Sequence, residues 1–317
     1  MGNIKSEICK KKRNSRNEFL EMIGPYRADL YLFCRKLTNS PWDAEDLAQE
    51  TIMRADIRLS DTHFGVENIK SYLFKMASNQ WIDWCRRSKV MVSVDNIPET
   101  PVYMNPQFEV KEALSSLIYY LPPKERVAIV LKDIFDFKID EIKDVMETTT
   151  GAVKSALHRG REKMVLIKEK SSRNIEPKIN QEHKEVVNKA VDFFNKRDIN
   201  GFCNLLLSNA TGNAYGCFLE SSAAEIKKGS IFHTINQPDG TPQPKEMRAE
   251  CVELYGENLF ILWVEDKLED IWRIQIEEGQ ISRFDCYYCC PKVLAEVAKL
   301  LGAKSNDHGY YYEDKRS

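Results

Sequence analysis

Carboxylate side chains crowd into the stretch SPWDAEDLAQE, residues 40–50, which contains no Lys or Arg. Ser40, Pro41 and Asp43 suit the N-terminus of a helix, and the apolar residues after them recur every three or four positions. The opposite side of the predicted helix carries Glu45, Asp46, Gln49, Glu50 and Met53, so it is mainly polar. Such a surface repels phosphate, so we expect it to face water or to bind a basic protein surface.

A second predicted helix, from Ile69 to Lys89, combines basic residues with aromatic ones. Its helical period places a core stripe at Ile69, Leu73, Met76, Ala77 and Trp84. An adjoining arc includes Ser71, Lys75, Ser78, Asn79 and Arg86. Lys and Arg neutralise phosphates, Asn can bind a base edge, and an exposed aromatic ring can stack on an unpaired base. The arc therefore suits nucleic acid, although the solubilising edge of an ordinary core helix would show the same pattern.

A helix-turn-helix pattern follows, with one helix near Ile139–Met146, a turn at Glu147–Thr149 and a second helix from about Thr150 to Met164. Basic residues outnumber acidic ones six to two between positions 149 and 170, so the second helix is the expected DNA-reading one. Two of its apolar residues can pack on the first helix, Val153 and Leu157. The side chains left for a DNA groove are Thr150, Lys154, Ser155, His158 and Arg159.

The overall composition is that of a globular chain. With 317 residues, 43% hydrophobic and 30% charged, it is long enough for two or three domains. No apolar run approaches the roughly 20 residues of a membrane span, and the N-terminus lacks the apolar segment of a signal peptide. We therefore expect a cytoplasmic protein whose nine cysteines are reduced thiols. The formal net charge of -2 hides local clusters of both signs, so binding to a polyanion is not excluded.

Changes in composition divide the chain into five segments: a helical block at 10–90, a Pro-containing linker at 91–107, a second helical block at 108–170, a polar linker at 171–180 and a final block at 181–317. The final block opens with a helix at about Glu182–Arg197. The strand-like runs NLFILWVED, IWRIQIEEG and QISRFDCYY follow, with a hairpin predicted at Glu278-Gly279. The expected fold class is therefore two all-α modules followed by an α+β domain.

The stretch DAEDLAQET resembles the most characteristic segment of bacterial RNA polymerase sigma factors, specifically the extracytoplasmic function (ECF) group. In that family this helix docks on a coiled coil of the polymerase's largest subunit. The resemblance implies a region 2 helical bundle at 10–90 and a region 4 helix-turn-helix at 108–170. It also implies a core polymerase contact made by Asp46, Leu47, Gln49 and Glu50.

The two basic helices also resemble segments of this family. Ile69–Lys89 is similar to the promoter-melting and proximal-element helix of the family. The resemblance implies DNA contacts by Asn79, Asp83, Arg86 and Arg87, and Lys75 of the basic arc lies beside them. Ser78 stands at a position where the family often has a basic residue. GAVKSALHRGREKM resembles the distal-element helix, which implies DNA contacts by Thr150, Lys154, Ser155, His158, Arg159 and Arg161. Glu147 replaces a glycine that is common in the turn, and Ala156 replaces an Arg that is frequent at its position. These two differences predict weakened or altered binding to the distal element.

The final block resembles the SnoaL-like, cone-shaped α+β domains that some of these sigma factors carry, through AYGCFLE, IKKGSIFHT and YYCCPKVLAEVAK. Enzymes of that superfamily use a carboxylate with a phenol or imidazole for proton transfer. The residues that could supply such groups are Asp285, Tyr287, Tyr255 and His233, but no spacing makes them converge and structural roles are expected. Cys286, Cys289 and Cys290 offer at most one corner of a zinc site, so we expect buried thiols. No catalytic residue, metal or cofactor is predicted.

We therefore predict a sigma factor, not an enzyme, that binds core RNA polymerase and promoter DNA but no membrane. The final block would modulate it and could hold an unknown small ligand. One alternative is a SnoaL-like isomerase or hydrolase fused to a DNA-binding region. Another is a helix-turn-helix repressor that acts as a dimer without polymerase. A repressor has no need for DAEDLAQET and an enzyme no need for two DNA-reading helices, which favours the sigma factor.

Overall fold

The structure is a computed structural model of the whole chain, and it forms two compact units, Met1–Glu176 and Pro177–Ser317. It describes residues 19–61, 68–88, 118, 120–170, 181–215, 218–231, 234 and 247–310. The predicted linkers at 91–107 and 171–180 lie outside these residues. Each unit is described by itself.

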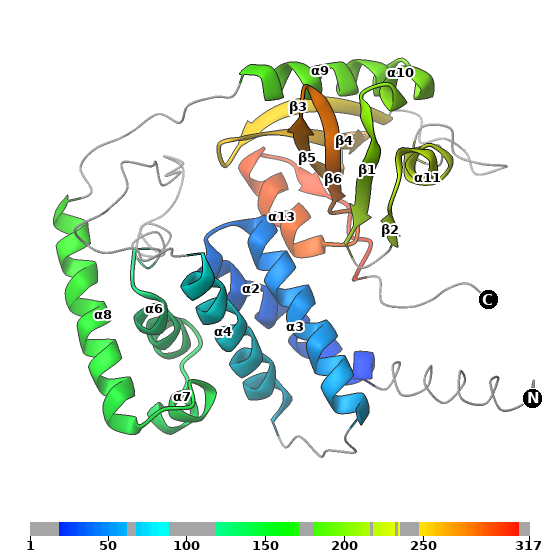
Figure 1. Cartoon of the computed structure of the whole chain (residues 1–317). Helices are drawn as coiled ribbons and strands as arrows, with labels where there is room; N and C mark the ends of the chain where they lie inside the picture. The colour runs from blue at the N-terminus through cyan, green and yellow to red at the C-terminus, as the bar shows by residue number, and fades with distance from the viewer. Residues whose placement is uncertain are drawn as a thin grey trace, which may run out of the picture. The chain divides into compact units, whose positions relative to one another are not determined.

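Three helices of the first unit run side by side (Figure 1): α2 (Arg27–Thr38), α3 (Pro41–Asp61) and α4 (Ile69–Arg87). The short turn η1 (Gly24–Tyr26) precedes α2. Asn39, in a left-handed conformation with φ 61°, ends α2. The Ser40 hydroxyl then accepts a hydrogen bond from the Asp43 N–H at 3.2 Å. Local chemistry thus starts α3 at the predicted residue.

After position 120 the same unit continues with α6 (Pro123–Ile129), the π-helical turn η3 (Val130–Ile134), α7 (Ile139–Val145) and α8 (Thr150–Lys170). The Thr149 hydroxyl accepts a hydrogen bond from the Ala152 N–H at 3.2 Å and so caps the start of α8. Glu147, in the turn between α7 and α8, has a φ of 48°. The predicted helix-turn-helix is confirmed, with bounds within one residue for its first helix.

An aromatic cluster joins the two helical modules into one core. Phe33 of α2 stacks on Phe74 of α4, with ring centroids 4.4 Å apart. Phe135, just after η3, meets these two rings edge-on at 5.8 and 5.0 Å. Phe137 stacks on Phe74 at 5.6 Å. Residues about 60 positions apart therefore pack directly, so the second module rests on α4.

The second unit is built on a seven-stranded mixed sheet in the order β2-β1-β6-β5-β4-β3, with β7 paired to β5. Its strands are β1 (Leu206–Ala214), β2 (Phe218–Glu220), β3 (Met247–Leu254), β4 (Glu257–Val264), β5 (Lys267–Glu277), β6 (Gln280–Cys286) and β7 (Lys304–Ser305). Its helices include α9 (Gln181–Asn195), α10 (Ile199–Cys203), α11 (Ala223–Lys228) and α13 (Pro291–Leu300). The sheet is mixed because β1 pairs with β6 in parallel, whereas β3 to β6 form an antiparallel meander.

Two tight turns fix the register of that meander. The pair Glu278-Gly279 has φ values of 52° and 74°, and Tyr255-Gly256 has 54° and 77°. Positive φ at both central residues is the requirement of the two-residue turn that matches strand twist. The hairpin predicted at Glu278-Gly279 is therefore confirmed.

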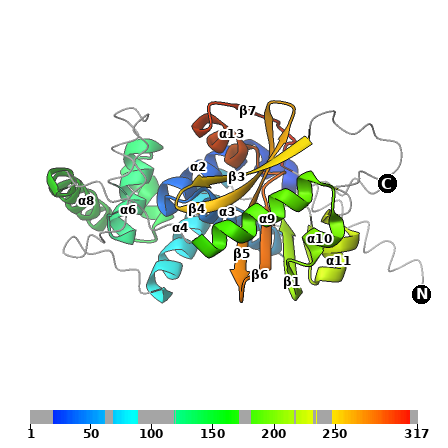
Figure 2. The same ribbon diagram turned by 90° about the horizontal axis from the view of Figure 1, so that it is seen from above.

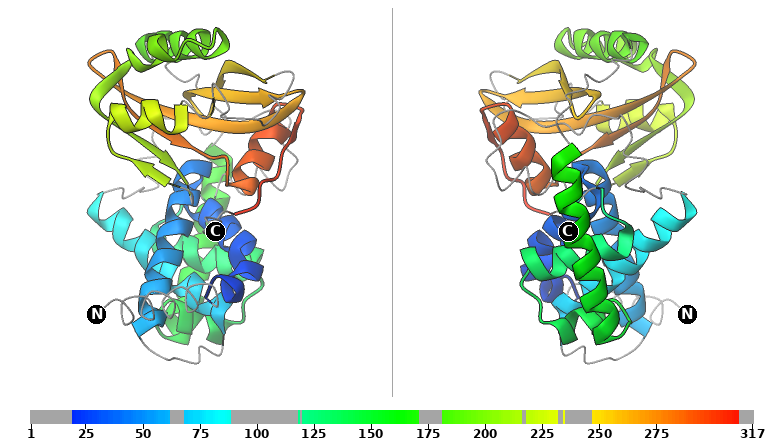
Figure 3. Two further views of the ribbon diagram at one scale, coloured as in Figure 1. Left: turned by 90° about the vertical axis from the view of Figure 1, so that its right-hand side faces the viewer. Right: turned by 90° about the vertical axis from the view of Figure 1, so that its left-hand side faces the viewer.

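Helices cover the sheet on both sides: α9 runs across its strands (Figure 2) and α13 lies on the opposite side (Figure 3). The α9 side is filled with aromatic rings. Trp272 stacks on Phe260 at 4.6 Å and on Phe284 at 5.5 Å, and Phe194 of α9 meets Phe260 edge-on at 5.3 Å. All four side chains are at most 1% exposed. The predicted helix around Glu182–Arg197 is confirmed, and so is an α+β architecture.

Candidate nucleic-acid interface

The acidic helix α3 divides its carboxylates between the core and the surface. Glu45 is fully buried and forms an ion pair with Arg27 of α2, which is itself 2% exposed. Gln49 is half-buried and donates to Glu45 Oε1 at 3.0 Å. The prediction that Glu45 lies on an outward acidic face was wrong, because α2 packs against that side of α3 and brings a cation with it.

Two other acids of α3, Asp46 and Glu50, lie on an exposed stripe of the helix. Asp46 and Glu50 are exposed, and one and two turns further along come Met53 and Ile57, which are 61% and 64% exposed. Their spacing of four, three and four residues keeps them on one helix face. The stripe therefore combines negative charge with apolar surface. Helical spacing predicted the exposed positions of Asp46, Glu50 and Met53, whereas Ile57 was assigned to neither side of the helix.

Leu47 is the other residue expected at the polymerase contact. Its side chain is half-buried. It lies between the core and the exposed stripe of α3.

Helix α4 places its predicted DNA contacts in two groups. Lys75 and Asn79, near its middle, both bind Glu147 from the turn of the helix-turn-helix, at 2.8 and 3.3 Å. Asp83 and Arg86, near its end, pair with each other at 3.0 Å and are exposed. Arg87 is also exposed; its Nε donates to the Asp83 carbonyl at 3.4 Å. The end of α4 thus carries accessible positive charge, whereas its middle is engaged.

Two positions of α4 differ from the sequence-based pattern. Trp84, expected in the core stripe, is 49% exposed, whereas Trp81 is buried against the guanidinium of Arg126 at 4.8 Å from its ring centroid. Ser78, expected on the DNA-facing arc, is fully buried and donates to the Phe74 carbonyl at 2.7 Å. A basic side chain at that position would point into the unit. The exposed aromatic ring at 84 stands beside the basic residues instead.

Helix α8 presents a basic surface that is only partly available. Lys154, Ser155 and His158 are exposed, and Thr150 is half-buried at the helix start. His158 lies 3.4 Å from Glu162 on the same helix. Val153 and Leu157 are buried, as predicted for the side that packs on the module. Ala156 is buried as well, so an Arg there could not extend to a DNA groove without repacking.

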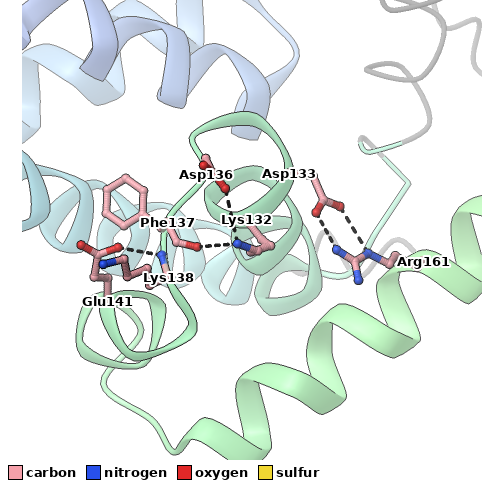
Figure 4. Close-up of polar contacts among 7 residues, drawn as sticks. All are labelled: Lys132, Asp133, Asp136, Phe137, Lys138, Glu141 and Arg161. Carbon is pink, nitrogen blue, oxygen red and sulfur yellow. Dashed lines mark hydrogen bonds and ion pairs between the residues drawn. The ribbon is translucent and has the colours of Figure 1, made fainter.

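Two arginines of α8 are bound back to their own module. Arg161 donates to both carboxylate oxygens of Asp133, at 2.6 and 3.4 Å (Figure 4), and this hydrogen bonding raises the pKa of Arg161. Arg159 pairs at 3.0 Å with Glu125, which is 5% exposed. Lys163 binds the other oxygen of that carboxylate at 2.9 Å. These residues fix α8 on α6 and η3.

The loop before α7 is also held by local polar contacts. Lys132 donates to the Phe137 carbonyl at 3.1 Å and lies 3.5 Å from Asp136 (Figure 4). The Lys138 N–H donates to Glu141 at 2.6 Å, which closes the first turn of α7. These contacts hold η3, the loop and α7 in the arrangement on which α8 packs.

The polar groups considered for proton transfer in the second unit have separate partners. Asp285 accepts from Arg283 at 2.8 Å and from Asn213 at 3.3 Å. The Tyr255 hydroxyl donates to Glu296 at 2.8 Å. The Tyr287 ring stacks on Tyr215, with centroids 4.8 Å apart. His233 lies outside the described residues. Contacts of this kind stabilise the fold of the second unit.

Asp270 of β5 is a buried carboxyl group that the sequence pattern did not single out. Its oxygens accept from the Trp272 indole N–H at 2.6 Å and from the Ile271 and Tyr287 backbone N–H groups at 2.7 and 2.9 Å. Burial raises its pKa to about 7. These bonds tie β5 to the segment that follows β6, so the group has a structural role.

The cysteines at the end of β6 and beyond it, Cys286, Cys289 and Cys290, are buried. Within the described ranges, no group of three or more His, Cys, Asp or Glu side chains is placed to hold a metal ion. Over the same residues, none of the helices combines the length and hydropathy needed to cross a membrane.

Comparison with known proteins agrees with this arrangement of helices. The sigma-70 region 2 family matches residues 22–90, and the sigma-70 region 4 family matches residues 111–164. The ECF RNA polymerase sigma factor SigM of Bacillus subtilis (strain 168) is 30% identical over 153 residues, which are 45% of this chain and 91% of SigM. The chain belongs to the ECF family of RNA polymerase sigma factors.

A second relative of this sigma factor, SigW of Bacillus subtilis (strain 168), is 27% identical over 178 residues, which are 50% of this chain and 93% of SigW. Both family matches lie within the first unit. For the second unit, the crystal structure of an NTF2-like protein of unknown function from Cytophaga hutchinsonii ATCC 33406 covers 36% of this chain and 93% of its own, at 11% identity and a TM-score of 0.26. That score is too low to establish a shared fold.

Proposed function

We propose that this sigma factor binds core RNA polymerase through the exposed stripe of α3, and promoter DNA through α4 and α8. It contributes the sequence specificity of transcription initiation while the polymerase performs the chemistry. Its site of action would then be the cytoplasm. The observation that carries the proposal is the difference in surface chemistry between α3 and α8 within one compact unit.

The polymerase contact is assigned to α3 because its exposed stripe is unsuited to DNA. Asp46 and Glu50 would repel phosphates, and Met53 and Ile57 supply apolar area that a protein partner can cover. Leu47 would contribute at the margin of the stripe, and Gln49 would do so through its half-buried amide.

Promoter DNA is assigned to α4 and α8. Lys154, Ser155 and His158 extend from α8, as side chains of the second helix of a helix-turn-helix do in a major groove. Arg159 and Arg161 can reach phosphates while their internal ion pairs hold the helix in place. On α4, Arg86 and Arg87 supply positive charge beside the exposed ring of Trp84, which suits a strand with unpaired bases.

A binding experiment on α3 tests the proposal. Asp46→Ala with Glu50→Ala should weaken capture of purified core RNA polymerase by about tenfold or more, since interface charge contacts contribute roughly 1 kcal/mol or more each. The matched control removes two exposed acids of α9, Glu182→Ala with Glu185→Ala, and should leave capture unchanged. Normal capture by the α3 variant would refute the docking surface.

We further propose that the second unit has the SnoaL-like fold expected from its motifs and that it modulates the activity of the first. A mixed sheet with helices on both sides supports this fold. The position of the second unit in one chain with the first supports a modulating role. The space beneath α9 is filled by aromatic side chains, among them Phe194, Phe260 and Trp272. A small ligand would have to bind elsewhere in the unit.

A further inference from the structure

The turn of the helix-turn-helix contains an unfavourable backbone conformation. Glu147 has a φ of 48°, in the left-handed region where glycine is the residue without steric cost. A non-glycine residue kept in such a conformation needs a compensating interaction or a function. The Glu147 side chain makes such an interaction.

The Glu147 carboxylate reaches across to the middle of α4. One oxygen lies 2.8 Å from Lys75 Nζ, and the other accepts from Asn79 Nδ2 at 3.3 Å. Lys75 lowers the pKa of Glu147 by hydrogen bonding and by its charge, so the carboxylate is ionised at neutral pH. A cation and an amide N–H side by side are also the groups with which a protein binds a nucleic-acid phosphate. The Glu147 carboxylate thus occupies the place on α4 at which a DNA phosphate would bind Lys75 and Asn79.

Stability alone is a poor explanation for this contact. Lys75 and Glu147 are 39% and 58% exposed, and ion pairs so exposed stabilise a fold only slightly. A left-handed conformation costs a non-glycine residue roughly 1–2 kcal/mol, so the ion pair does not make this turn a net source of stability. The packing of the two modules is secured elsewhere, by the aromatic cluster and by buried Arg126, which donates to the Leu37 carbonyl at 2.5 Å. The Glu147 contact is therefore dispensable for the fold.

We propose that Glu147 is an intramolecular competitor of DNA: its carboxylate occupies Lys75 and Asn79 in the free sigma factor and has to be displaced before a phosphate can bind there. The proposal rests on the assignment of α4 to promoter DNA. It makes the turn a regulatory element that lowers binding of the free chain to nucleic acid. A phosphate that approaches Lys75 is also repelled by the carboxylate itself, which adds to the competition.

The test is a titration of the full-length chain with a short fluorescein-labelled single-stranded DNA at low salt. Glu147→Gly removes the carboxylate and the backbone strain together, and we expect its Kd to be about twofold to fivefold lower than that of the natural chain. The gain should vanish at high salt, because the competition is electrostatic.

The matched control is Asp136→Gly. Asp136 is also an acidic residue with a positive φ, of 53°, and it pairs with Lys132 of its own module rather than with α4. The two variants have the same net charge, so a general gain from lost negative charge would appear in both. An equal decrease of Kd in Asp136→Gly, or no decrease in Glu147→Gly, would overturn the competition.

Lys75→Ala separates the competition from the underlying assignment. If Lys75→Ala weakens DNA binding in the Glu147→Gly background and abolishes the gain, the proposal holds. If Lys75→Ala weakens binding but Glu147→Gly does not strengthen it, the competition fails while α4 remains a DNA-binding helix. If Lys75→Ala has no effect in either background, the contact of Lys75 with DNA is wrong and the competition fails with it.

Discussion

Replacement of Glu45 by Gln provides a sharp test of how α3 divides its charges. Glu45 is fully buried and paired with Arg27, which is 2% exposed. The variant keeps the shape of the side chain but removes the buried negative charge that pairs with the guanidinium. Removal of one partner of a buried ion pair typically costs about 3–5 kcal/mol, because the other charge stays desolvated. That is a large part of the roughly 5–15 kcal/mol that stabilises a domain.

The expected loss is measurable by thermal or urea unfolding of the full chain, followed by circular dichroism. A domain of about 150–250 residues shifts its Tm by about 2–4 °C per kcal/mol, so the first unit should melt about 6–20 °C lower. The control is Glu50→Gln, five residues along the same helix. Glu50 is half-exposed and pairs with Arg54 at i+4, so its replacement should change the free energy of unfolding by about 0.5 kcal/mol or less.

Equal stability of the two variants would refute this reasoning. It would mean that Glu45 is accessible to water and belongs to the outward acidic surface after all. A further variant checks the mechanism: Arg27→Met with Glu45→Leu removes both charges and should recover most of the lost stability, because a well-packed apolar pair can replace a buried ion pair.

Four further predictions address the other surfaces and the second unit. In the holoenzyme, Lys154→Ala with Arg159→Ala should weaken promoter binding and reduce the slope of log K against log salt by up to about 2, whereas an unchanged slope would reassign the recognition helix. Deletion of all residues after Arg173 should alter promoter-specific transcription by reconstituted polymerase without abolishing polymerase binding; identical output would exclude a modulating role. Burial raises the pKa of Asp270 to about 7, above its value in the unfolded chain. The folded second unit therefore retains this proton more strongly, and its free energy of unfolding in urea should decrease as the pH rises from about 4 to above 7, with a flatter profile in Asp270→Asn. Gly201→Ala should destabilise that unit by about 1–3 kcal/mol in the same assay, because a Cβ there would lie 2.3 Å from a phenylalanine ring carbon of α9; an unchanged urea midpoint would contradict this close contact.

Much of the local structure could be predicted from the sequence because its causes are local. Ser40 and Thr149 cap their helices as their side-chain chemistry requires. Glu278-Gly279 forms the expected hairpin because Gly279 adopts the positive φ of the second turn position without steric cost. The apolar period of α9 places Phe194 in the core. Each of these outcomes depends on residues within a few positions of one another.

The functional surfaces were harder to predict, because exposure depends on neighbours that are distant in sequence. Trp84 was placed in the core and Ser78 on the surface by helical period alone, and both assignments were wrong. The stripe of α4 that is buried is selected by the residues packed on it, among them Arg126 from the second module, which covers Trp81. No periodicity within α4 contains that information.

The sequence by itself determined where the helices and turns of this sigma factor begin, which helices are acidic or basic, and the family to which the chain belongs. Only the tertiary structure decided which charges remain available. Glu45 is withdrawn from the acidic face by Arg27, and Lys75 is engaged by Glu147 from a turn about 70 residues away. The physical reason is that charge is a property of one residue, whereas desolvation and pairing are set by the groups that folding places around it.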